Sequence, residues 1–253
     1  MGELVNELIS CISSSPQKVK TVFIGQRFTA VQLKSRDVGI ALTPPRVFDS
    51  CIGMSKLSGS FTKYNTTELA KFCTGGNSFL KAMGWAAINA VLQKNLKQRS
   101  DYLKGDFLDI LKIQKEDTVA MIDYYTTKIG RLKRANLMIF DDRFAEKRRD
   151  VQMFPMSSLP EMLPEADVVI IPPTMLDKID EIRRMASGAR DFVVVHPTTP
   201  PLPESFFKRG VTLVATMMIL DADSLIRYVM EGAGTALFKK FCEKIAFSSR
   251  CKD

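Results

Sequence analysis

The chain of 253 residues is poor in the side chains that most often build metal centres. It has one histidine, His196, and five cysteines, none of which form a CxxC pair. A zinc site with two or more histidines is therefore excluded within one chain. An odd number of widely spaced cysteines argues against a disulfide framework and for reduced thiols. We accordingly expect a cytoplasmic protein and assign no metal ligands, although the patterns do not decide whether a metal is bound directly.

Other common signatures are also missing. The longest apolar run, residues 211–220, falls well short of the roughly 18 residues that cross a bilayer. Glu3 and Glu7 stand where a signal peptide needs positive charge. The chain has no GxGxxG, no GxSxG and no glycine-rich phosphate loop ending in Lys-Ser/Thr. We therefore expect no membrane partner, and neither an ordinary NAD site nor a hydrolytic triad is supported.

The positive charge of the chain is concentrated in its first half. Residues 1–115 carry 16 Lys/Arg against 8 Asp/Glu, whereas residues 116–253 carry 20 of each, for a net charge of +8. This excess suits an anionic ligand or a nucleic acid, but a lysine-rich solvated surface is the simpler interpretation and the one we favour. The basic residues from Lys128 to Arg149 are mixed with acidic ones, so we interpret them as a solvated face as well.

The first half of the chain predicts a small α+β unit. We expect a helix over 2–12, a hairpin over 19–33 turning at 25–27, a strand over 38–42, a short helix to 72, and a long helix from 77 or 78 through 92. Residues 43–64 are polar and glycine-dotted, which predicts a loop. The charged stretch 94–115 is the expected boundary, giving domains 1–115 and 116–253.

The second half predicts a parallel sheet covered on both faces, because its short apolar runs do not alternate and are separated by helices. The expected strands are 118–122, 137–140, 167–171, 192–195 and 211–215, with helices at 175–186 and 222–230. This arrangement is α/β, doubly wound and Rossmann-like.

Ligands of open parallel sheets bind beyond the carboxyl ends of the strands. The residues expected there are Asp123, Tyr124, Asp141, Thr174, His196, Pro197, Thr198 and Thr199. Asp141 lies close to the spacing at which an acidic residue holds a ribose hydroxyl, although a solvated or capping carboxylate is equally consistent. Tyr124 presents a ring on which an aromatic ligand can stack.

Two segments stand out from the rest of the chain. Prolines stiffen the loop His196 to Pro201, which fixes the hydroxyls of Thr198 and Thr199 near an imidazole. That suits a polar ligand, and a rigid turn that caps the next helix is the alternative. In the long helix, the small residues from Gly84 to Ala90 allow close approach of another backbone. Asn89 among them needs a hydrogen-bond partner, either a ligand or a loop carbonyl.

Taken in order, several stretches resemble a family described as "putative heavy-metal chelation" proteins. The matching segments are Val38–Pro44, Gly84–Ala90, Asp167–Ile170, Val195–Pro200, Gly210–Val211 and Glu231–Gly234. The resemblance spans residues 20–235. It implies an enolase N-terminal-like domain, a Rossmann-like domain and a site in the cleft between them, with Asn89 and the loop 197–200 at that cleft.

We therefore expect a two-domain protein that binds a small polar or anionic ligand, such as a metal chelator or its precursor, between the domains. A non-enzymatic carrier for a metal complex is one alternative, and a nucleic-acid-binding module is another. The departures from the family pattern at Tyr124–Thr127 and Pro172–Thr174 fall where a ligand would sit. The patterns identify no cofactor and do not decide whether the protein is an enzyme. A homodimer is the default assembly, since such dimers are the commonest.

Overall fold

The computed structural model describes residues 2–44, 56–123, 126–142 and 151–250. Its first part, residues 2–96, is called the first lobe here, and residues 103–250 are called the second lobe. The first lobe holds an antiparallel sheet in the order β1 (Val19–Ile24), β2 (Phe28–Leu33) and β3 (Val38–Leu42). The α-helices within its described residues are α1 (Glu3–Ser13), α3 (Thr66–Ala70) and α4 (Ser78–Leu96).

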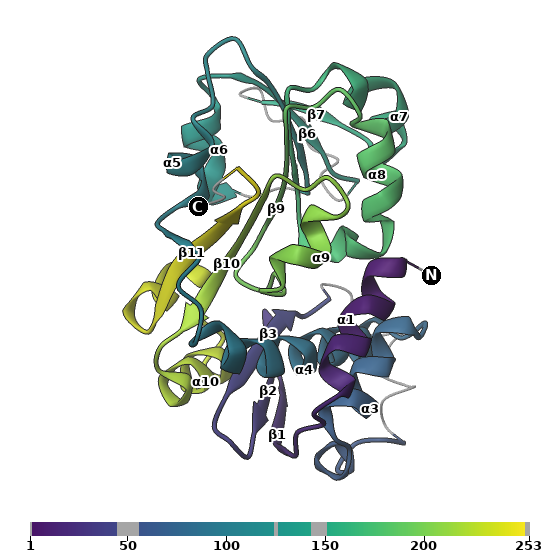
Figure 1. Cartoon of the computed structure of the whole chain (residues 1–253), viewed down its shortest axis with the longest axis vertical. Coiled ribbons are helices and arrows are strands. Elements are labelled where there is room, and N and C mark those ends of the chain that lie inside the picture. The colour runs from purple at the N-terminus through teal and green to yellow at the C-terminus, as the bar shows by residue number, and fades with distance from the viewer. Residues whose placement is uncertain (1, 45–55, 124–125, 143–150, 251–253) are drawn as a thin grey trace.

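Helix α4 packs on the small sheet and is the central element of the first lobe (Figure 1). It begins where the side chain of Asn77 accepts the N–H groups of Phe79 and Leu80, which satisfies two donors that have no partner within the helix. On β3, a Cβ added to Gly39 would lie 2.1 Å from the nitrogen of Ala90 and 2.2 Å from the oxygen of Ala86. The prediction that this helix allows close approach of another backbone is confirmed.

The second lobe is built on a mostly parallel sheet of eight strands. Their order is β4 (Leu103–Lys104), β11 (Cys242–Ser248), β10 (Leu213–Ile219), β9 (Asp191–Val195), β8 (Val168–Ile171), β5 (Thr118–Ile122), β6 (Asn136–Phe140) and β7 (Gln152–Phe154). From β5 the chain adds β6 and β7 on one side, then β8, β9 and β10 on the other, all parallel. This is the strand order of a doubly wound Rossmann sheet, so the predicted fold class is confirmed.

Helices cover both faces of the large sheet (Figure 1). Helices α5 (Phe107–Leu111) and α6 (Thr126–Leu132) lie on one face, and α7 (Leu159–Met162), α8 (Ile179–Met185) and α9 (Pro203–Phe207) lie on the other. Helix α10 (Ala222–Met230) packs against the small sheet of the first lobe. No helix in the described ranges has both the length and the apolar character that a membrane crossing requires.

The helices and strands agree with the predicted ones in type, but several differ from them in their bounds. The strand 118–122 and the helix 222–230 have the predicted bounds, whereas the strand predicted at 211–215 runs from Leu213 to Ile219. Strands β4, β7 and β11 were not expected. The first two are only two and three residues long, and β11 contains the charged pair Glu243 and Lys244. The division at residue 115 stays a prediction, although β4 and α5 already pack with the second lobe.

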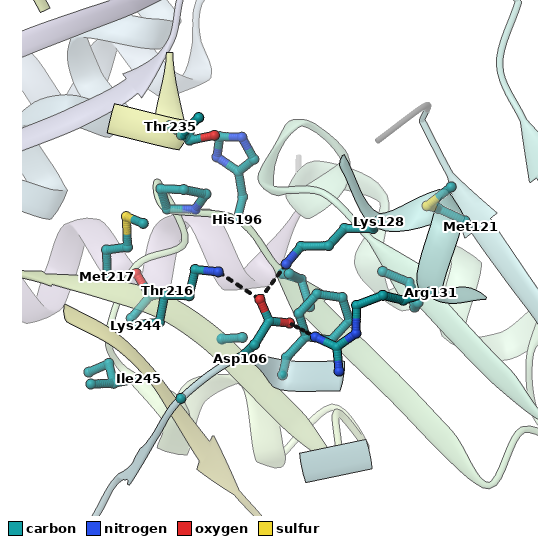
Figure 2. A pocket seen from close by; sticks show the side chains of 17 residues that line it. Asp106, Met121, Lys128, Arg131, His196, Thr216, Met217, Thr235, Lys244 and Ile245 are labelled. Carbon is teal, nitrogen blue, oxygen red and sulfur yellow. Dashed lines mark hydrogen bonds and ion pairs between the residues drawn. The ribbon is translucent and has the colours of Figure 1, made fainter. Parts of the chain in front are cut away.

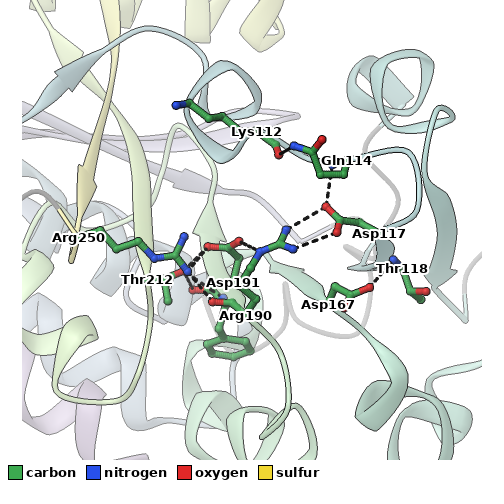
Figure 3. A network of polar contacts seen from close by, with 10 residues as sticks. Lys112, Gln114, Asp117, Thr118, Asp167, Arg190, Asp191, Thr212 and Arg250 are labelled. Atoms are coloured by element: carbon green, nitrogen blue, oxygen red, sulfur yellow. Dashed lines mark hydrogen bonds and ion pairs between the residues drawn. The ribbon is translucent and has the colours of Figure 1, made fainter.

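Ion pairs join the amino ends of the parallel strands (Figure 3). Arg190, just before β9, binds both carboxylate oxygens of Asp117, just before β5, at 3.0 and 2.9 Å. It also contacts Asp191 at 3.0 Å, and Arg250 contacts Asp191 from the other side at 3.0 Å. The Arg190 guanidinium lowers the pKa of Asp117. Charged groups therefore connect the amino ends of these strands, whereas ligands of this fold bind in the loops at the carboxyl ends.

The two lobes are joined by side chains of α4. The amide of Asn89 donates to the carbonyl of Ile40 at 2.9 Å and to the carbonyl of Thr198, in the second lobe, at 2.8 Å. One turn further on, Gln93 donates to the carbonyl of Met217 at 2.7 Å and accepts the N–H of Ile219 at 3.1 Å. All four contacts are buried, so α4 fixes the proline-rich loop and the end of β10 relative to the first lobe.

Candidate functional site: a cationic cavity at the sheet edge

A cavity of about 400 Å³ opens on the face of the large sheet that α5 and α6 partly cover (Figure 2). Its wall is mostly apolar and comes from near the carboxyl ends of β5, β8 and β9 and from β10. The apolar residues lining it are Phe107, Met121, Ile170, Val195, Pro197, Ala215, Met217, Ala236 and Ile245. All described residues that line it lie between Gly105 and Ile245, so the first lobe contributes none of them.

Three cations converge on one carboxylate at one end of this cavity (Figure 2). The Oδ2 atom of Asp106 contacts the ammonium groups of both Lys128 and Lys244, the latter at 2.7 Å. Its Oδ1 atom lies 3.5 Å from the guanidinium of Arg131, which also pairs with Asp109. Three positive charges thus face the carboxylates of Asp106 and Asp109, and the remaining positive charge at this end of the cavity attracts anions.

Local backbone geometry places Asp106 at this point. The preceding residue, Gly105, has a φ of +125°, which favours glycine, and its N–H donates to the carbonyl of Lys244 at 3.0 Å. The Asp106 carboxylate then accepts the N–H of Leu108 at 3.2 Å and caps the short helix α5. The carboxylate is therefore held from its own backbone while the three cations come from α6 and β11.

The cluster lowers the pKa values of both Asp106 and Lys128, for different reasons. Burial alone would raise the pKa of Asp106, but hydrogen bonds from Lys128 and Lys244 outweigh it and lower that pKa to about 2. Burial lowers the pKa of Lys128, and the bond to Asp106 offsets this only in part, because Lys244 and Arg131 also act against the ammonium. The side chain of Lys128 is 20% exposed, against 49% for Lys244. Lys128 is thus the more enclosed of the two amines.

His196 forms part of the cavity lining where β9 ends. Its Nδ1 atom accepts the backbone N–H of Thr198 at 3.2 Å and lies 2.8 Å from the Thr198 hydroxyl. An Nδ1 that accepts a hydrogen bond carries no proton, so in the neutral ring the proton resides on Nε2. Burial lowers the pKa of this imidazole to about 3. The ring is therefore neutral and held in one tautomer throughout the physiological pH range.

The residues expected at the site fall into three groups. His196 and Pro197 line the cavity. Asn89, Thr198 and Thr199 are buried outside the cavity lining. Asn89 donates to the loop carbonyl of Thr198, as one of its two interpretations expected, and also to the carbonyl of Ile40 in strand β3. Asp123, Asp141 and Thr174 lie at the ends of β5, β6 and β8, outside the cavity lining; Asp123 has a φ of +70°, Asp141 is buried and Thr174 is exposed. Tyr124 lies outside the described residues.

Sequence reasoning missed the charged residues of the cavity. It interpreted Lys128 and Arg131 as part of a solvated face, which is wrong for Lys128, because its side chain is largely buried against Asp106. The spacing of 128 and 131 on one face of a helix was a usable signal. Asp106 and Lys244 carried none, since they come from a glycine turn and an unpredicted strand that meet only in the fold.

These observations define a class: a two-lobed α/β protein whose Rossmann-ordered sheet carries a cationic cavity near its carboxyl edge. Family comparison gives the class a name. Residues 106–248 match the DUF364 model and residues 5–92 match the DUF4213 model, both described as "putative heavy-metal chelation". The chain belongs to this family, and the predicted resemblance is confirmed. The segment 106–248 contains every lining residue of the cavity except Gly105.

Similar proteins are known by sequence and by structure. An uncharacterised protein of Methanocaldococcus jannaschii is 29% identical over 187 residues, which cover 70% of each chain. Two crystal structures of DUF364 proteins of unknown function match nearly the whole fold, each with a TM-score of 0.79. The one from Desulfitobacterium hafniense DCB-2 is 18% identical, covering 98% of this chain and 97% of that one. The one from Pyrococcus horikoshii is 21% identical, covering 97% and 98%.

Proposed function

We propose that the protein binds a small organic anion with an apolar portion in the cavity between Asp106 and His196. The observation that carries the proposal is the excess of positive charge around Asp106, where three cations face the two carboxylates of Asp106 and Asp109. The apolar wall formed by residues such as Met121 and Ile170 supplies the surface for the uncharged part of the ligand. Pockets of this type obtain affinity from apolar contact and orientation from a few charged groups.

The charge of the cavity also indicates how the protein takes part in metal chelation. No three His, Cys, Asp or Glu side chains of the described residues come together as metal ligands. The groups that do converge are mostly cations, which repel a bare metal ion and attract a carboxylate. We infer that the ligand is a carboxylate-bearing chelator, its precursor, or its anionic metal complex. A carrier for such a complex needs only this binding step.

A second candidate site lies at the junction of the lobes, where the sequence resemblance places the ligand. Asn89 Oδ1 and Thr199 Oγ1 are both buried and have no hydrogen-bond partner in the described structure. An unpaired buried oxygen costs free energy, so both atoms favour a polar guest or a water molecule near the proline-rich loop. We rank this site below the cavity because the lobes already contact each other directly there, through Asn89 and the Thr198 carbonyl.

Titration calorimetry with picolinate tests the proposal. Picolinate is an aromatic chelator with one carboxylate, and picolinamide has nearly the same shape without the charge. We expect binding of picolinate at least tenfold tighter than picolinamide, and a loss of at least tenfold in affinity for Lys244→Gln, because a charge-assisted contact is worth about 1.5–3 kcal/mol.

Lys104→Gln is the matched control, since Lys104 pairs with Glu243 on the adjoining strand and does not line the cavity. Its affinity for picolinate should equal that of the unaltered protein. Equal binding of picolinate and picolinamide, or equal affinities for the Lys244 and Lys104 variants, would contradict the proposal. Titrating the anionic complex of nickel(II) with three picolinates beside free picolinate then distinguishes a binder of the chelator from a carrier of its complex.

A further inference from the structure

The cluster at Asp106 contains more positive charge than its carboxylates neutralise, because three cations face only Asp106 and Asp109. Arg131 stays protonated in any protein environment, so the excess is relieved most easily by loss of a proton from one of the two lysines. Both lysine nitrogens contact the same oxygen, Asp106 Oδ2, which brings the two ammonium groups close to each other. Two cations that share one counter-charge in a partly buried site each make the other less stable.

Lys128 is the lysine that this arrangement affects most. Its side chain is the less exposed of the two, and its nitrogen lies 5.2 Å from the centre of the Phe107 ring, beside the apolar wall. Lys244 is nearly half exposed, so water stabilises its charge. The direction of the Lys128 pKa, lowered by burial and by Lys244 and Arg131, agrees with this geometry. A lowered pKa increases the fraction of the Lys128 amine that is neutral, and the neutral amine is the nucleophilic form.

Resting on the proposed anion-binding function, we propose that Lys128 is a nucleophilic amine that forms a Schiff base with a 2-oxo acid bound in the cavity. Lys244 and Arg131 hold the carboxylate of such a compound. The carbonyl carbon next to that carboxylate then lies against Lys128, and the apolar wall receives the remaining part of the molecule. A 2-oxo acid is the simplest compound that offers both an anion and an electrophilic carbon at adjacent atoms.

The chemistry is an addition followed by a dehydration. Lys128 first loses its extra proton to solvent, because a carboxylate with a pKa of about 2, such as Asp106, is a poor proton acceptor. The neutral nitrogen forms a bond to the carbonyl carbon, the C=O electron pair moves to oxygen, and one proton passes through solvent from that nitrogen to the oxygen, giving a neutral carbinolamine. The ammonium of Lys244 then donates a proton to the hydroxyl, which leaves as water while the nitrogen lone pair forms the C=N bond, and the second nitrogen proton returns to Lys244. The products are the imine and one water molecule, with no oxidant or reductant required.

Reductive trapping tests this inference on the unaltered protein. Incubation with pyruvate and cyanoborohydride converts any imine into a stable carboxyethyl-lysine, which peptide mapping by mass spectrometry locates. We expect Lys128 to be modified at least ten times faster than Lys104, an exposed lysine whose pKa is held above its ordinary value by Glu243. The pH of half-maximal modification should also be lower for Lys128. Acetone, which lacks the carboxylate, should show a smaller preference for Lys128 than pyruvate does.

Two further experiments distinguish a failure of this inference from a failure of the proposed function. Picolinate should slow the modification of Lys128 and leave that of Lys104 unchanged, and Lys128→Arg should remove the fast adduct. If Lys128 is modified no faster than Lys104, the proposal that Lys128 is a nucleophile is wrong, while the proposed anion binding is unaffected. If calorimetry shows no preference for picolinate over picolinamide, the proposed function fails. In that case, modification of Lys128 that is as fast with acetone as with pyruvate indicates an accessible amine without an anion site.

Discussion

Replacing Gly39 by alanine is expected to destabilise the protein by about 3 kcal/mol or more, or to prevent folding. The added methyl group would lie 2.1 Å from the Ala90 nitrogen and 2.2 Å from the Ala86 oxygen, and both are backbone atoms of α4. Overpacking of a core costs about 1–3 kcal/mol when side chains can adjust, and a helix backbone adjusts less. Because α4 also carries Asn89 and Gln93, its displacement would weaken the contacts between the lobes.

Gly76→Ala serves as the control for this experiment, because a Cβ at Gly76 would have no atom within 4 Å. Its effect on the free energy of unfolding should stay within about 0.5 kcal/mol. Chemical denaturation of both variants measures the difference. If Gly39→Ala proves as stable as Gly76→Ala, the close approach of β3 and α4 described here is wrong.

The second large effect concerns the charge of His196. In the unfolded chain its pKa should be close to the ordinary value of 6.5, whereas in the folded protein burial lowers it to about 3. As the pH falls below 6.5, the imidazole binds a proton in the unfolded chain but not in the folded protein. The stabilisation from a neutral His196 is therefore complete above pH 6.5 and is lost progressively towards pH 3. At pH 4 the loss amounts to roughly 3 kcal/mol.

The chain has a single histidine, so its NMR signals are unambiguous. The ring proton shifts should stay constant from pH 5 to 8 in the folded protein. In denaturation experiments, the stability of His196→Asn should fall less steeply between pH 6.5 and 4 than that of the unaltered protein, by the equivalent of about one proton. A native-state titration of the imidazole with a midpoint near 6.5 would contradict the buried, neutral ring that lines the cavity.

The sequence predicts features that depend on neighbouring residues, and it does not predict features that depend on contacts between distant segments. The run 118–122 predicted its strand because a strand buried on both faces needs a continuous apolar segment. Likewise, the His196–Pro200 loop was expected at a strand end, and His196 and Pro197 do line the cavity. These features depend on neighbouring residues in the chain.

The cationic cluster depends instead on contacts between distant segments. Asp106 and Lys244 are 138 residues apart and meet only because β11 pairs with β10 and with β4 at the far edge of the sheet. The short strands and the charged β11 lack the periodic apolar signal from which strands are predicted. The first half of the chain holds the excess of positive charge, yet the cations of the cavity come from the balanced second half. Composition therefore pointed away from the site.

The central claim, that the cavity at Asp106 receives an organic anion, is tested most directly by a crystal structure with 5-bromopicolinate. The bromine scatters anomalously, so its position is measured without interpretation of the surrounding density. We expect the carboxylate between Lys128, Lys244 and Arg131, with the bromine against the apolar wall near Ile170 and Val195. Bromine density located elsewhere on the protein, or an empty cavity at millimolar ligand concentration, would contradict the account.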